Sequence, residues 1–124
     1  YGNGNWDDMW LVKTSTGGSM EWQKTFGGSY DETGHYVHEK TEGGFMIVGS
    51  TESFGQGLFD IWVISTDYTG NEIYSQTFGG SMDDKALKGT KLDNGALLII
   101  GYTESFGNGG DDVLLISIDP DYQP

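Results

Sequence analysis

The sequence predicts an all-β protein made of repeated four-stranded antiparallel units, and three observations support this. TFGGSYDE at Thr25–Glu32 returns as TFGGSMDD at Thr77–Asp84, a spacing of 52 residues (77 − 25). A fixed period in this range is typical of repeat architectures. Short apolar runs alternate with turn-forming residues, among them 21 glycines. No window keeps an apolar period of 3.6 residues, so we expect no helix of consequence.

Other segments recur at the same offset. TESFG at 51–55 returns at 103–107, and DIWVIS at 60–65 returns as DVLLIS at 112–117. DMWLVK at 8–13 is an earlier copy of this last segment, again 52 residues away (60 − 8). Because no gap interrupts the offset, each strand predicted in one copy predicts its counterpart in the others.

The first two expected strands form a hairpin. Met9–Thr14 is an apolar run followed by the turn residues 16–18. In Met20–Phe26, side chains 20, 22 and 24 alternate with the polar side chains 21, 23 and 25, as in a half-buried strand. Gly27 and Gly28 end this strand.

The next four strands form one complete unit, and we label them a to d. They are expected at Gly34–Lys40, Phe45–Ser50, Ile61–Thr66 and Glu72–Phe78. Strand c is the clearest, because β-branched and aromatic residues dominate it. A turn at 41–43 joins a to b, and a longer loop, TESFGQG, follows b.

The last three strands repeat a, b and c at Lys85–Leu92, Ala96–Tyr102 and Val113–Ile118, with Asn94-Gly95 in a tight turn that tolerates positive φ. The chain therefore reads c–d, a–b–c–d, a–b–c. Such sheets bury one another when they stack around an axis as propeller blades. We expect a single domain over 1–124, with a partial blade at 1–28, a full blade at 29–80 and a partial blade at 81–124.

One longer pattern resembles a known family. The phrase D-W-V-x-x-D-x-x-G-x-x-x-[WY]-x-x-x-F-G-G-S-x-D reads here from Asp60 through Asp67 and Tyr74 to Asp83, with two extra residues between Asp60 and Asp67, and the N-terminal copy has Ser15 where Asp67 stands. It resembles the repeats of bacterial and archaeal extracellular β-propellers, sometimes called SBBP-type repeats. The resemblance covers nearly the whole chain. It implies a propeller at an extracellular or cell-surface location, and it implies little about activity because propellers host unrelated functions.

Within that pattern, Ser65–Gly70 resembles the Asp-box turn of sialidase-type propellers. In such a turn a short Asp side chain caps backbone N–H groups while Gly supplies the left-handed residue. We therefore interpret Asp67 as structural.

Composition narrows the function. The 124 residues allow one small domain, and the absence of cysteine excludes both a disulfide framework and a thiolate metal site. Nineteen acidic residues against six basic ones give a net charge of −13, which opposes binding to nucleic acid and anionic lipid. No apolar run approaches the roughly 20 residues that cross a bilayer, so no membrane insertion is expected. A start at Tyr1 without a leader is typical of a mature secreted product or of a piece of a longer chain.

The open ends of this arrangement have to be covered. Closed propellers have about four to eight blades, whereas this chain supplies about two and a quarter. Unpaired edge strands at both ends invite pairing. Several copies could form a ring in which Met20–Phe26 of one chain closes onto the last three strands of the next. The chain could also belong to a longer array, or a non-closing contact could build a filament. We expect a homo-oligomer or neighbouring blades as partners.

Acidic residues recur on one predicted face, where the d–a and b–c connections emerge. Asp31, Glu32, Asp83 and Asp84 follow Gly-Gly-Ser and offer the hard oxygen ligands that Ca²⁺ prefers. Glu52 and Glu104 would lie on the same face and could contact a glycan or a basic protein. The simpler interpretation is that these residues hold turns. No cofactor other than this Ca²⁺ is expected.

Catalytic patterns are missing from the sequence. His35 and His38 occur in one copy only, and neither a nucleophile elbow nor a phosphate-binding Gly-Lys-Ser/Thr loop is present. Trp6, in a Gly/Asn-rich loop, is the tryptophan best placed to stack on a sugar. The sequence therefore predicts a non-enzymatic extracellular module for structural assembly or for protein or surface interaction. The alternative is a carbohydrate- or Ca²⁺-binding lectin-like propeller that uses the acidic loop face.

Overall fold

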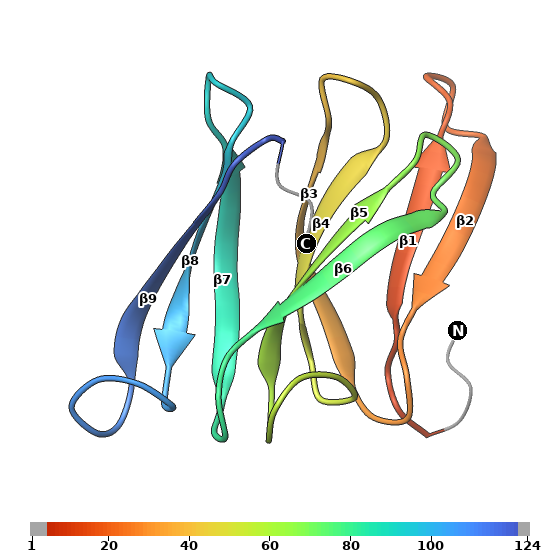
Figure 1. Cartoon of the computed structure of the whole chain (residues 1–124). Helices are drawn as coiled ribbons and strands as arrows, with labels where there is room; N and C mark the ends of the chain where they lie inside the picture. The colour runs from red at the N-terminus through yellow and green to blue at the C-terminus, as the bar shows by residue number, and fades with distance from the viewer. Residues whose placement is uncertain (1–4, 122–124) are drawn as a thin grey trace.

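The computed structural model describes residues 5–121 and contains three antiparallel sheets that stand side by side in a row (Figure 1). The first sheet pairs β1 (Met9–Thr14) with β2 (Met20–Phe26). The second has the strand order β3 (Glu32–Glu39), β4 (Phe45–Thr51), β5 (Asp60–Thr66), β6 (Glu72–Phe78). The third has the order β7 (Asp84–Lys91), β8 (Leu97–Thr103), β9 (Asp112–Ile118). The part of the chain described contains no helix, so the all-β antiparallel prediction is confirmed.

The predicted strand bounds are correct to within one residue except at the start of β3, which lies two residues earlier than the predicted Gly34. β3 and β7 begin at Glu32 and Asp84, so these two residues belong to strands and not to the preceding loops. The backbone N–H of Glu32 donates to the carbonyl of Asp7 at 2.6 Å. The N–H of Asp84 donates in the same way to the carbonyl of Phe59 at 2.7 Å. Glu32 and Asp84 pair with Thr51 and Thr103 within their own sheets, and their N–H groups also bond to the residues that lead into β1 and β5.

Four hairpin turns share one geometry. In each, a glycine N–H donates to the carbonyl three residues earlier, as in Gly95 to Leu92 at 2.9 Å. The glycines all have positive φ: Gly18, Gly43, Gly70 and Gly95. Asn94 is not among the positive-φ residues, so the predicted Asn94-Gly95 turn needs the left-handed conformation at glycine alone. This is the three-residue type of hairpin loop, in which a type I turn precedes a glycine bulge.

Two apolar clusters fill the gaps between the sheets. In the first gap, Met9, Leu11 and Phe26 of the first sheet pack with three residues of the second: Ile47, Trp62 and Ile64. In the second gap, four residues of the second sheet (Met46, Val48, Ile61 and Val63) pack with four of the third (Ala86, Leu97, Ile99 and Ile118). β5 is buried along all seven residues because it faces both gaps, its side chains alternating between them.

Candidate functional site

The predicted acidic residues do gather at one end of the sheets, where β3 and β7 begin, but two of them are buried. Glu32 is 2% exposed and Asp84 is fully covered. Glu32 Oε1 accepts hydrogen bonds from Thr51 Oγ1 at 2.8 Å and from the Ser53 N–H at 3.1 Å. Its Oε2 accepts one from the Gly28 N–H at 2.9 Å. The Glu32 carboxylate thus joins the start of its own strand to the loop after β4.

Asp84 repeats this arrangement in the third sheet. Its carboxylate accepts hydrogen bonds from the hydroxyls of Thr103 and Ser105, and from the Gly80 N–H at 2.8 Å. Burying a carboxyl group has a desolvation penalty, and hydrogen-bond donors of this kind offset it by replacing water. The repeated donor set therefore explains why an acid can occupy these two positions.

Asp31 and Asp83 connect neighbouring sheets. Asp31 Oδ1 accepts a hydrogen bond from the Asp7 N–H at 2.8 Å, and Asp83 Oδ1 accepts one from the Phe59 N–H at 3.1 Å. Together with the backbone bonds made by Glu32 and Asp84, each arrangement holds both polar backbone groups of a residue that leads into a strand of the preceding sheet. We call these two arrangements the inter-sheet clamps: Asp7 with Asp31–Glu32, and Phe59 with Asp83–Asp84.

Asp60, the first residue of β5, lies beside the second clamp. It is 1% exposed, and its Oδ2 accepts a hydrogen bond from the Gln56 N–H at 2.6 Å. Its Oδ1 has no hydrogen-bond partner among the residues described. Burial raises the pKa of Asp60, the Gln56 N–H opposes that rise, and the charge of Asp84 adds to it. A Cβ on Gly79 would lie 2.3 Å from Asp60 Oδ1 and 2.9 Å from Asp84 Oδ2, so only glycine fits between the two carboxylates.

The four acidic residues predicted to bind Ca²⁺ are hydrogen-bonded to the protein itself. All four predicted Ca²⁺ ligands accept hydrogen bonds from backbone or hydroxyl donors, as the simpler interpretation of the sequence holds. Within residues 5–121, no group of three or more His, Asp or Glu side chains is arranged to hold a metal ion. Binding of Ca²⁺ by Asp31, Glu32, Asp83 and Asp84 stays a prediction.

The predicted partner residues do not form one site. Trp6 is 49% exposed, precedes the first sheet and packs edge-to-face on Tyr30, with ring centroids 5.8 Å apart. Glu104 is exposed after β8 in the third sheet, at the opposite end of the row (Figure 1). Desolvation raises the pKa of Glu104, and a hydrogen bond to Asp111 adds to the rise. Glu52, after β4, donates its backbone N–H to the Asp31 carbonyl at 2.9 Å and is partly buried.

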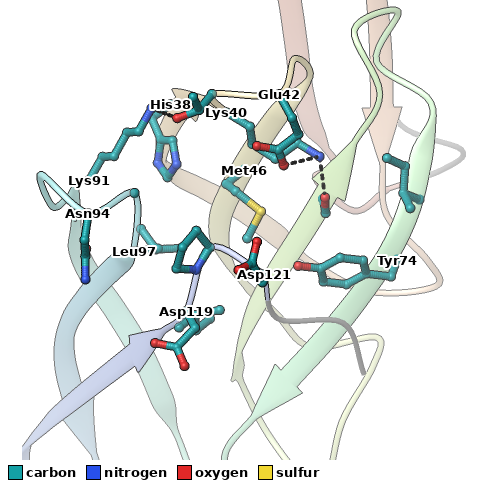
Figure 2. Close-up of a pocket in the computed structure, with 16 residues that line it drawn as sticks. His38, Lys40, Glu42, Met46, Tyr74, Lys91, Asn94, Leu97, Asp119 and Asp121 are labelled. Atoms are coloured by element: carbon teal, nitrogen blue, oxygen red, sulfur yellow. Dashed lines mark hydrogen bonds and ion pairs between the residues drawn. The ribbon is translucent and has the colours of Figure 1, made fainter.

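A pocket of about 480 Å³ lies between the second and third sheets, lined by the turns that follow β3 and β7 (Figure 2). Lys40 Nζ donates to Ser65 Oγ at 2.9 Å and lies 3.8 Å from Glu42 Oε1. Lys91 Nζ donates to the Glu39 carbonyl at 3.1 Å. Both ammonium groups are therefore engaged by the protein itself.

His38, which occurs in one copy of the repeat only, belongs to the same pocket. Its Nδ1 is buried without a hydrogen-bond partner among the residues described. Desolvation and then the nearby Lys91 charge lower the pKa of His38, although Glu42 partly opposes this. The 52-residue offset was the one signal that could have placed β3 beside β7 and so revealed this pocket.

One serine and one histidine approach each other. Ser50 Oγ lies 3.3 Å from His35 Nε2, but Ser50 is 1% exposed, so a substrate carbonyl could not reach its hydroxyl. Desolvation followed by the Lys85 charge lowers the pKa of His35, and no carboxylate in the described part of the chain accepts a hydrogen bond from its ring. The pair lacks the access and the orienting acid that an activated nucleophile needs.

The two ends of the row expose apolar side chains. On the outward side of the third sheet, Ile100, Val113 and Leu115 are 46%, 79% and 62% exposed. We call these three residues the β9 face. On the outward side of the first sheet, Trp10 is 53% exposed, and Val12 points the same way because Met9 and Leu11 point into the first gap. We call Trp10 and Val12 the β1 face.

Comparison with known proteins found no match to this sequence, either among family models or among curated proteins. In the described part of the chain, no helix is long and apolar enough to cross a membrane.

Proposed function

We propose that this protein is a non-enzymatic extracellular or cell-surface module whose sheets are propeller blades and whose two ends bind protein. One observation carries the proposal. The β9 face residues Ile100, Val113 and Leu115 stand 52 positions after Val48, Ile61 and Val63, which are 0%, 0% and 1% exposed inside the second gap. The same positions are thus buried between sheets and exposed at the end of the row.

The energetics favour covering that end. Fully burying a side chain such as valine or leucine is worth about 1.5–3 kcal/mol. Contiguous apolar surface rimmed by polar residues is typical of interaction sites. In the described part of the chain no fourth strand lies beside β9, which leaves a row of backbone donors and acceptors unpaired at its outer edge.

The blade interpretation is supported by the strand orders and by the clamps. The three sheets contain c–d, a–b–c–d and a–b–c in sequence, and the two gaps use corresponding positions of the 52-residue period. A row of sheets that twists in the same sense at each step would close into a ring. The extracellular location follows only from the resemblance to SBBP-type repeats.

The solution mass of the purified chain tests the proposal. We expect a discrete multiple of the 13.5 kDa chain, or larger particles, by light scattering or analytical ultracentrifugation. A Val113→Lys/Leu115→Lys variant should be monomeric. Ile73→Lys is the matched control, because Ile73 is 58% exposed on β6 but lies outside both end faces. A wild-type chain that stays monomeric throughout the micromolar range would contradict assembly.

The alternative, a lectin-like module that binds carbohydrate or Ca²⁺, is supported by one local feature. Desolvation raises the pKa of Glu104 most, and the charges of Asp111, Asp83 and Asp84 add to the rise, which indicates a concentration of negative charge at that loop. A glycan array with and without chelator would separate the alternatives. Chelator-sensitive binding that disappears in Glu52→Gln/Glu104→Gln, with unchanged thermal unfolding, would favour the lectin-like module.

A further inference from the structure

We propose that the β9 face binds the β1 face of a second copy of this chain, so that copies join head to tail. This inference rests on the proposed function and specifies its partner. The molecule already makes a contact of this kind twice within itself.

The second gap shows the contact in full. Ile61 and Val63 of β5 belong to one apolar cluster with Leu114 and Ile116 of β9. Val113 and Leu115 occupy the places of Ile61 and Val63 one period later. Trp10 and Val12 occupy the places of Leu114 and Ile116 two periods earlier. The two end faces therefore carry the two halves of a contact that is complete inside the chain.

The first gap repeats the same contact with other residues. Met9 and Leu11 of β1 stand in the places of Ile61 and Val63, and they pack against Trp62 and Ile64 of β5. Side chains from two strands at the same repeat position thus belong to one apolar cluster in each gap. A head-to-tail contact between copies would be the third instance, continuous with the first two.

Cross-strand pairing defines the surface more closely. Lys88, Ile100 and Leu115 are direct neighbours across β7, β8 and β9, so their side chains lie in one row on the same side of the sheet. In the second sheet the corresponding row is Tyr36, Val48 and Val63. That row faces the third sheet, where Val48 and Val63 belong to the apolar cluster and Tyr36 packs against it.

The β1 face has a shape that suits this row. A groove of about 700 Å³ runs along β1 and β3, because the first sheet has no strands corresponding to β3 and β4 among the residues described. Val37 on β3 is 46% exposed there. The incoming β8 would lie over this groove while the incoming β9 packs on Trp10 and Val12.

The charges are complementary as well. Lys88 projects from the same side as the β9 face. β7 contains three of the six basic residues of the chain: Lys85, Lys88 and Lys91. The groove at the opposite end is lined by Asp7 and Asp8. A contact between two β9 faces would instead place the Lys88 side chains of both copies in the same interface. Charge therefore favours head-to-tail contact.

Two variants, each blocked at one end, test the inference by complementation. Val113→Lys/Leu115→Lys blocks the β9 face, and Trp10→Lys blocks the β1 face while β1 and β2 keep their backbone ladder. Each variant alone should be monomeric. An equimolar mixture should double in mass and grow no further, because one open β9 face meets one open β1 face.

The outcomes separate this inference from the proposed function. If wild type associates but Trp10→Lys alone still forms dimers, the ends join like to like, and only the head-to-tail contact is overturned. The head-to-tail contact is likewise overturned if wild type associates while the mixture remains monomeric. A wild-type chain that is itself monomeric overturns both proposals.

A cross-linking experiment keeps the test decisive if Trp10→Lys fails to fold. The chain has no cysteine, so Leu115→Cys and Val12→Cys each place a single thiol on one end face. A short bismaleimide added to the mixed variants should yield covalent dimers that contain one copy of each variant. Dimers formed only between two Leu115→Cys copies would overturn the head-to-tail contact.

Discussion

Asp67 shows how a single side chain organises a turn. Its Oδ1 accepts hydrogen bonds from the Thr69 hydroxyl at 2.8 Å, the Thr69 N–H at 2.8 Å and the Asn71 N–H at 3.0 Å. The Asn71 side-chain amide donates to Oδ2 at 3.2 Å. The Thr69 hydroxyl contributes most to lowering the pKa of Asp67, which falls to about 2 against an opposing effect of desolvation.

This depressed pKa predicts a pH dependence of stability. Because the folded-state pKa lies below the ordinary value of 3.8, the Asp67 interactions stabilise the protein above pH 3.8 and are lost as the pH falls toward about 2. We expect Asp67→Ser to have a lower Tm than wild type at pH 7, and the difference should shrink within that window.

Ser15 supplies the reason for choosing serine in that experiment. It occupies the corresponding turn between β1 and β2, where its Oγ accepts a hydrogen bond from the Ser19 N–H at 3.2 Å. The chain therefore already forms the same turn with a neutral side chain. A Tm difference that remained constant from pH 7 to pH 2 would show that the charge of Asp67 does not matter.

The buried acids could be predicted only in part from the sequence. Glu32 and Asp84 were recognisable as a recurring acid pair, and their link to a turn was foreseen. Their burial was not, because the hydroxyls of Thr51 and Thr103 that satisfy them lie 19 residues away. The repetition of both acid and threonine at the 52-residue offset was the available signal.

At the scale of elements, the hairpins followed closely from the sequence. Apolar runs bounded by glycine turns specify β1, β2 and β6 to the residue, since strand and turn are both local properties. The starts of β3 and β7 were placed too late, because Glu32 and Asp84 pair with Thr51 and Thr103 on the neighbouring strands. Such a contact has no signature in the strand's own residues.

Packing between β3 and β7 depends on one glycine. A Cβ on Gly89 would lie 2.5 Å from Cδ1 of the Tyr36 ring. We expect Gly89→Ala to lower the free energy of unfolding by about 1–3 kcal/mol, as overpacking of a core commonly does. Urea denaturation would measure the loss.

Gly34 is the matched control for that substitution. A Cβ there would meet only Met9, with its Sδ at 3.5 Å, an ordinary contact, and alanine already stands at the corresponding position, Ala86. Gly34→Ala should therefore change stability little. If the combination of Gly89→Ala with Tyr36→Ala costs the full sum of the two single changes, the ring is not the cause.

At the scale of the whole molecule, charge should affect assembly more than folding. Lys88 is exposed on the third sheet, so Lys88→Glu should leave the unfolding transition nearly unchanged. It should weaken head-to-tail association by about 1.4- to fivefold at low salt, since exposed ion pairs contribute about 0.2–1 kcal/mol. Light scattering across a salt series is the measurement, with Lys24→Glu on β2 as the control. Equal weakening by both variants would indicate a general effect of net charge.

The molecular scale is where the sequence was least informative. The row of sheets followed from the period and from strand order, yet the offset alone could not show which apolar residues the ends leave exposed. That required knowing which side of each strand faces a gap. The pocket containing His38 was also missed, since it forms between elements that are distant in sequence.

The inter-sheet clamps have a kinetic consequence. Their side-chain bonds join residues only 24 positions apart, so little chain entropy is lost when one sheet docks on the one before it. Short closures of this kind favour rapid folding. A nascent chain could therefore dock β3 on the first hairpin before β7 has been synthesised, and the molecule would be built from its N-terminus one sheet at a time.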